Sequence, residues 1–260
     1  MVDLGSVSQP VWFFGRRHLG VLYGIEKNKN QVGCFRSTNG GTNWIWPPAW
    51  LDTLAWFPLH AEIVVDTSGS YEWAFGTWYD LDTLGYWWIM FNLSDDGGAM
   101  WEETAIQLYK DSTYVADPSV VADIRDGDED VVVSWALWDE TAGEWKIYRR
   151  HSDDMGDYWG TPCAISSAYS DGSIDPELIL SANDGYLYDF WADYDLSGSP
   201  VGAEIVYKYS TNGGETWVPQ PPTSLSDGET YSLRPSACKH EGVVWEDYRY
   251  GNWEIYFDSP

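Results

Sequence analysis

The chain is poor in basic residues and has no long apolar run, and each shortage excludes a class of protein. Its 260 residues include 14 lysines and arginines against 41 aspartates and glutamates, so the formal net charge at pH 7 is −27. A field of that sign repels phosphate groups, and we therefore expect no nucleic acid as a partner. No apolar segment approaches the roughly 18 residues that a membrane-spanning helix needs, so we expect no membrane insertion.

Cysteine is also scarce. The three cysteines, Cys34, Cys163 and Cys238, are far apart in the chain and odd in number. They form neither a disulfide framework nor the close spacing of a metal site, and at most one disulfide could join two of them.

The first residues lack the basic start and apolar stretch of a secretion signal. The sequence leaves the compartment and the oligomeric state open, although we favour an extracellular or cell-surface location over a cytoplasmic one.

Aromatic residues are abundant, at 17% of the chain, with 18 tryptophans and 18 tyrosines. A disordered chain would be poor in aromatics, so this chain folds. Aromatic and β-branched residues punctuated by Gly, Asp, Asn and Ser are typical of strands and turns. The composition therefore predicts an all-β domain.

An eight-residue phrase occurs four times: Ser, any residue, Asp or Asn, any residue, Gly, two further residues, and Trp. Its defining residues are Ser37, Asn39, Gly41 and Trp44; Ser94, Asp96, Gly98 and Trp101; Ser152, Asp154, Gly156 and Trp159; and Ser210, Asn212, Gly214 and Trp217. The four tryptophans are 57, 58 and 58 residues apart. A fixed period of this size indicates a repeat architecture.

The phrase has the chemistry of a tight turn. The Asp or Asn side chain can accept backbone N–H bonds within the turn, and the glycine supplies a positive φ. The phrase resembles the Asp-box of sialidase-type (BNR) repeats, and this resemblance implies a β-propeller in which these residues are structural. It covers four of five repeats, and it marks the fold more strongly than any activity.

Each repeat reads as four strands, which predicts a single propeller domain of five blades. The expected blades are residues 10–57, 58–113, 114–172, 173–230 and 231–260, the first strand of the first blade being Pro10–Phe13. The last repeat stops before a fourth strand. We therefore expect residues 2–9, within a segment 1–9 left over at the start, to complete the last blade and close the propeller.

Strands alternate in direction within a blade, so the repeated turns lie at one end of the sheets and the starts of the first strands at the other. Carboxylates and aromatic rings gather at that other end, where they could bond sugar hydroxyls and stack on sugar rings. We predict a ligand-binding mouth there. Its candidate residues are Glu62, Asp117, Asp175, Glu177 and Arg234 from first strands, and Trp78, Trp191, Trp245, Asp247 and Arg249 from the ends of second strands and the loops after them.

Three functions fit this reading. The first is carbohydrate recognition without catalysis. The second is glycoside hydrolysis by paired carboxylates, with Glu177 as the acid and Asp117 as the base. The third is a protein-interaction scaffold. The family's own activity is not expected, because sialidases bind the substrate carboxylate with three arginines and only Arg234 and Arg249 are well placed here.

We expect no cofactor, although the acidic run 123–130 leaves calcium as an option because carboxylate clusters bind Ca²⁺ through oxygen ligands. The run lacks the spacing of an EF-hand loop and is more often a solvated turn. The expected partner is therefore a glycan or another small molecule.

Overall fold

The computed structural model describes residues 16–18, 21–28, 31–39, 41–66, 72–166, 171–195, 202–226, 231–238 and 242–260. The predicted pairing of residues 2–9 and the predicted strand Pro10–Phe13 lie outside the described residues. No described helix is long and apolar enough to cross a membrane.

Within the described residues the strands form five antiparallel sheets, in which neighbours in sequence are neighbours in the sheet. The first sheet is β1 (Arg16–His18), β2 (Val21–Asn28), β3 (Gln31–Ser37) and β4 (Ala49–Asp52), and the second is β5 (Leu59–Asp66), β6 (Trp73–Leu81), β7 (Trp87–Ser94) and β8 (Ile106–Asp111). The third is β9 (Val115–Asp123), β10 (Asp130–Asp139), β11 (Glu144–Ser152) and β12 (Cys163–Ala164), and the fourth is β13 (Gly172–Leu180), β14 (Leu187–Asp195), β15 (Gly202–Ser210) and β16 (Val218–Ser224). The fifth is β17 (Ser232–Cys238), β18 (Gly242–Asp247) and β19 (Glu254–Asp258), and a short 3₁₀ helix, η1 (Arg125–Gly127), joins β9 to β10.

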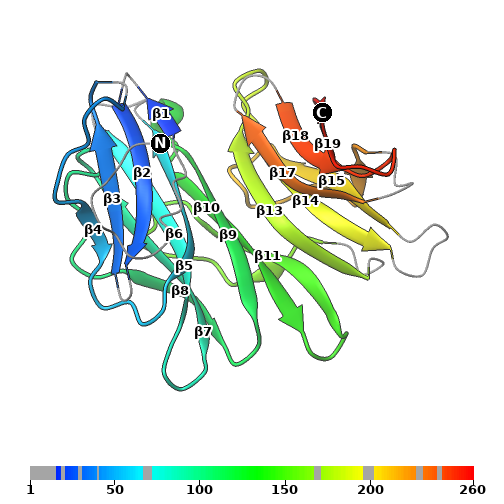
Figure 1. Cartoon of the computed structure of the whole chain (residues 1–260), viewed down its shortest axis with the longest axis horizontal. Coiled ribbons are helices and arrows are strands. Elements are labelled where there is room, and N and C mark those ends of the chain that lie inside the picture. Colours follow the sequence, from blue (N-terminus) through cyan, green and yellow to red (C-terminus); the bar gives the residue numbers. More distant parts are fainter. Residues whose placement is uncertain are drawn as a thin grey trace.

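The all-β prediction of four-stranded antiparallel sheets is confirmed. Consecutive sheets pack face to face, and their first strands, β1, β5, β9, β13 and β17, contact one another in that order. Figure 1 shows the sheets succeeding one another, with β9–β11 between the β1–β8 part and the β13–β19 part. One small difference from the sequence reading is η1, a turn of helix where we expected none.

Both faces of an inner sheet are apolar, because each is covered by a different neighbour. In β10, Val131, Val133 and Trp135 pack against the second sheet. The alternate residues Val132 and Ala136 pack against the fourth. Successive side chains of a strand point to opposite faces, so a sheet held between two others needs a nearly continuous apolar run.

The four repeated turns share one hydrogen-bond pattern. In the third, the backbone N–H of Gly156 donates to Ser152 Oγ over 2.8 Å, and that of Tyr158 donates to Asp154 Oδ1 over 2.8 Å. Ser37, Ser94 and Ser210 accept from Gly41, Gly98 and Gly214 in the same way. These four glycines have φ between 75° and 100°, a conformation that a side chain would strain. The four serines are buried, and their hydroxyl groups are used within the turns.

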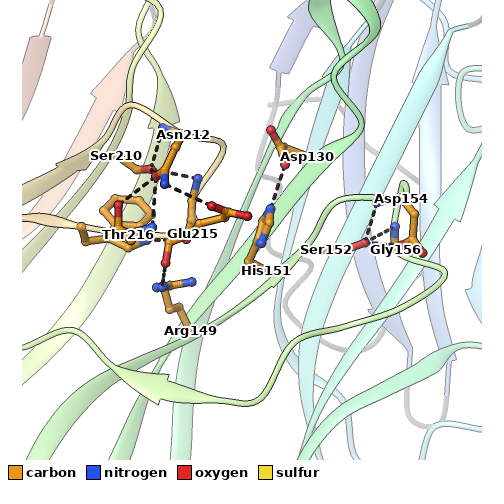
Figure 2. Close-up of polar contacts among 12 residues, drawn as sticks. Asp130, Arg149, His151, Ser152, Asp154, Gly156, Ser210, Asn212, Glu215 and Thr216 are labelled. Carbon is orange, nitrogen blue, oxygen red and sulfur yellow. Dashed lines mark hydrogen bonds and ion pairs between the residues drawn. The ribbon is translucent and has the colours of Figure 1, made fainter.

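The second, third and fourth repeated turns also pack on the preceding sheet. Gly214 lies against Val132 and His151 of the third sheet, and a Cβ there would be 2.4 Å from Val132. Beside it, Arg149 Nη2 donates to the carbonyl oxygen of Glu215 over 2.7 Å, and His151 Nε2 lies 2.8 Å from Asp130 Oδ1. Figure 2 shows these side chains reaching from the third sheet toward the turn 210–217. The glycine therefore allows close packing as well as a turn.

The closing tryptophans differ in burial. Trp217 is buried, whereas Trp44, Trp101 and Trp159 are partly exposed. Trp217 donates its indole N–H to the carbonyl oxygen of Gly214 over 2.9 Å, and the Arg149 guanidinium lies 5.9 Å from its ring. The prediction of largely buried rings therefore holds best for Trp217.

Replacing Trp217 with Ala should lower the free energy of unfolding by about 3–5 kcal/mol, the range for removing a large buried aromatic ring. Urea denaturation followed by circular dichroism measures this. Trp46→Ala is the matched control, because Trp46 is 72% exposed and its loss should cost far less. An equal effect of the two substitutions would contradict the packing role of Trp217.

Candidate functional site at the mouth

Four residues occupy the same position in four successive repeats. His60, Asp117, Asp175 and Arg234 stand near the starts of β5, β9, β13 and β17, 57, 58 and 59 residues apart. Each lies where the pairing with the second strand shifts register, so each first strand bulges there. Such bulges aim a side chain differently from its neighbours and are common beside active sites.

The backbone is strained at all four positions. The φ angles are 33° at His60, 47° at Asp117, 54° at Asp175 and 53° at Arg234, in the left-handed region that residues with a Cβ seldom adopt. Non-glycine residues in such conformations cluster at functional sites, because surrounding structure has to hold them there. Four non-glycine residues with polar, titratable side chains at one repeat position therefore mark this end of the sheets as the candidate site.

The four side chains form a chain of contacts across four sheets. His60 Nδ1 lies 3.4 Å from Asp117 Oδ1. Asp175 in turn interacts electrostatically with Asp117 and with Arg234. Arg234 Nη1 in turn donates to Glu246 Oε2 over 2.8 Å. The structure thus brings together three of the predicted residues, Asp117, Asp175 and Arg234, and adds His60. We call these four the mouth cluster.

The acids of the mouth cluster are electrostatically unequal. Burial and the nearby Asp117 charge raise the pKa of Asp175 to about 6, against the opposing effect of Arg234. Below about pH 6 the Asp175 carboxyl group is therefore mainly protonated. Burial and the charge of Asp117 also raise the pKa of Tyr79 to about 12, so this phenol stays protonated. Burial and the charge of Asp175 likewise raise the pKa of Tyr194.

Glu62 and Glu177 lie two residues beyond the mouth cluster on their strands. Glu177 Oε1 accepts the backbone N–H of Ala237 over 3.3 Å, and Ser119, at the same repeat position, accepts that of Leu178 over 2.9 Å. This position therefore bridges one first strand to the next. Glu62 is buried, at 6% exposed. We predicted that Glu177 and Asp117 act as a pair. Glu177 is bonded to the backbone of the neighbouring first strand, whereas Asp117 belongs to the mouth cluster.

The prediction that Trp78, Trp191 and Trp245 face a ligand is wrong. All three rings lie in the core between sheets, exposed by 0%, 0% and 4%. Successive side chains of a second strand point toward the sheets on either side of it. These three side chains therefore point into the space between two sheets rather than out of the mouth.

Asp247 is also structural, which corrects the prediction that it binds a ligand, and Arg249 is its main partner. Arg249 donates to both Asp247 oxygens, over 2.9 and 2.7 Å, and Trp245 Nε1 and Ser232 Oγ donate to Asp247 as well. Burial alone would raise the pKa of Asp247, but these hydrogen bonds, led by those from Arg249, hold it far below its usual range. The carboxylate has no exposed surface for a ligand.

The calcium option gains no support from the acidic run. Arg125 donates to both oxygens of Asp123, and Asp130 pairs with His151. Across the part of the chain that the structure describes, no three His, Cys, Asp or Glu side chains converge as metal ligands. Cys34, Cys163 and Cys238 are free thiols.

No protein-family model matches the chain, and no curated protein matches it. Solved structures do. An α-L-arabinanase of Penicillium chrysogenum complexed with arabinobiose has a TM-score of 0.66 at 14% identity, over 96% of this chain and 78% of that one. The GH93 α-L-arabinofuranosidase of Fusarium graminearum, also with arabinobiose, has a TM-score of 0.57 at 14% identity, over 93% and 78%.

A Hadza microbial sialidase has a TM-score of 0.51 at 17% identity, over 88% of this chain and 52% of that chain. Arabinanases and sialidases are carbohydrate-active propellers, and identities this low establish a shared fold alone. The chain therefore has the sialidase-like β-propeller fold, as its repeated phrase predicted.

Proposed function

We propose that the chain binds a neutral glycan of the arabinan type at the mouth cluster. The observation that carries the proposal is the set of four strained, non-glycine residues at one repeat position, joined by contacts into a single cluster. Two of the structural neighbours were solved with arabinobiose, which supports a glycan as the ligand and makes arabinobiose the first probe.

The chemistry of the cluster suits sugar hydroxyls. The carboxyl oxygens of Asp117 can accept hydrogen bonds and the Arg234 guanidinium can donate them, so sugar hydroxyl groups can bond either as donors or as acceptors. Asp117 is one-third exposed and Arg234 is 70% exposed, which leaves both within reach of a ligand. Arg234 and Glu246 also line a surface hollow of about 410 Å³.

The charge of the site favours a neutral sugar over an acidic one. Arg234 is already paired with Glu246 and interacts with Asp175, and the chain as a whole is strongly negative. A sugar carboxylate would meet Asp117 and Glu246 at close range, and like charges so placed repel. Sialidase activity, which depends on three arginines, is therefore not proposed.

Hydrolysis of the bound glycan is the second candidate, favoured by the raised pKa of Asp175. A carboxyl group with a pKa near 6, close to a second carboxyl group, suits a general acid in glycoside hydrolysis. This version assigns the acid to Asp175 rather than Glu177, whose carboxylate is bonded to the backbone of β17.

Replacing Asp117 with Asn should weaken arabinobiose binding about tenfold, because one hydrogen bond to a charged group is lost. Isothermal titration calorimetry measures the affinity. Asp157→Asn is the matched control, since Asp157 is exposed in a repeated turn at the opposite end of the sheets, and its affinity should be unchanged.

Equal affinity of the wild type and Asp117→Asn would place the sugar elsewhere. A wild-type chain that binds neither arabinobiose nor any sugar on a glycan array would refute glycan recognition. The scaffold interpretation would then be the one to pursue.

If the site is hydrolytic, kcat/KM should fall as pH rises through about 6, because the acid form of Asp175 is required and is lost above its pKa. Asp175→Asn should lower kcat by roughly 10²–10⁴-fold, the contribution of a general acid, and remove this fall with pH. Initial rates on a nitrophenyl arabinofuranoside, measured at a series of pH values, give both the pH dependence and the loss in kcat. A wild-type rate that stays level from pH 5 to pH 8 would exclude Asp175 as the acid.

A further inference from the structure

Three exposed aromatic rings share a second repeat position around the mouth. Phe57, Tyr114 and Tyr231 each stand three residues before a member of the mouth cluster, namely His60, Asp117 and Arg234. Their exposed fractions are 55%, 60% and 36%, whereas the tryptophans of the second strands are buried. We call these three residues the aromatic collar. In the fourth sheet the position is Gly172, so the collar is open on that side.

The collar residues are held in place by their backbones. Asp80 Oδ1 accepts the N–H of Phe57 over 2.5 Å. The carbonyl oxygen of Tyr114 accepts the N–H of Trp138 over 2.9 Å, and that of Tyr231 accepts the N–H of Tyr248 over 3.0 Å. Rings on fixed backbones lose little freedom when a ligand arrives, which favours binding.

Around Tyr114 the rings continue inward to the mouth cluster. The ring centroids of Tyr114 and Trp87 are 5.4 Å apart, and those of Trp87 and Tyr79 are 5.9 Å apart. The charge of Asp117 acts on Tyr79. Tyr79 also pairs across the strands with Leu59, the residue before His60. An aromatic path therefore leads from the mouth to the exposed ring of Tyr114.

The spacing of the collar distinguishes between kinds of ligand. A protein partner or a lipid surface calls for a contiguous apolar patch, commonly of several hundred Å². The collar instead offers rings in the segments before β5, β9 and β17, each three residues from a polar member of the mouth cluster. A chain of sugar units presents alternating apolar faces and hydroxyls, which match rings and polar groups placed in turn.

We propose that the aromatic collar forms outer sugar subsites, so that the ligand is an oligosaccharide that extends beyond the mouth cluster over Tyr114 or Tyr231. This inference rests on the proposed glycan binding, and it adds that affinity grows with chain length. The mouth cluster holds the units at the centre, and the collar rings stack against units farther along the chain.

Affinities for arabinobiose and arabinohexaose, measured by calorimetry, test the collar. The wild type should bind the hexaose at least tenfold more tightly than the biose. Tyr114→Ala or Tyr231→Ala should lose about tenfold in affinity for the hexaose and less than twofold for the biose, the loss of one stacked ring. Tyr114→Phe keeps the ring and should bind as the wild type does.

Tyr158→Ala is the matched control, because Tyr158 is 79% exposed but lies in a repeated turn at the other end of the sheets, and it should change neither affinity. The inference is overturned if the wild type binds both sugars equally, if both alanine variants keep full affinity for the hexaose, or if they lose affinity for the biose to the same extent. A wild type that binds neither sugar refutes the proposed function itself, which separates the two failures.

Discussion

The packing of every inner sheet between two others is the constraint on which the rest of the structure depends. A strand in such a sheet must be apolar on both faces, as Val131, Val132 and Val133 are in β10. Polar side chains that could contact a ligand are therefore found mainly at strand ends and at bulges. The mouth cluster stands at such bulges, where a positive φ turns one residue out of the alternation.

The space between the third and fourth sheets shows the cost of departing from this constraint. Asp189 and Lys208 are buried there, almost without exposure. Burial raises the pKa of Asp189 and lowers that of Lys208 to about 8, although each charge favours the other. Lys208 Nζ donates to the carbonyl oxygen of Ile165, and Arg149 ties the same region to the turn 210–217. Lys208 of the fourth sheet is thus bonded to the residue that follows β12, which ties the fourth sheet to the third.

Much of this arrangement could be predicted from the sequence because it repeats. The phrase from Ser37 to Trp44 and its three copies predicted the turns and the sheets, since the same local chemistry closes each turn. The alternation of strand direction then placed Asp117, Asp175 and Arg234 at one end. Trp78, Trp191 and Trp245 were misjudged because a repeated Trp near a strand end fits a core position and a rim position equally well. Only the register of the second strand against both neighbours distinguishes these, and the sequence alone does not contain it.

The role of Glu177 escaped prediction for a related reason. Glu177 stands two positions after the bulge at Asp175, at a regular strand position. The sequence does not show which of the two carboxyl groups points toward the mouth. At Asp175 the bulge turns the side chain toward its counterparts in the neighbouring sheets. At Glu177 the regular strand directs it to the backbone of β17. The bulge converts a symmetric scaffold into an asymmetric site, because the same turned-out position holds His60, Asp117, Asp175 and Arg234 in successive sheets. A row of four side chains of different charge can treat the two ends of a ligand differently, which a row of identical residues could not do.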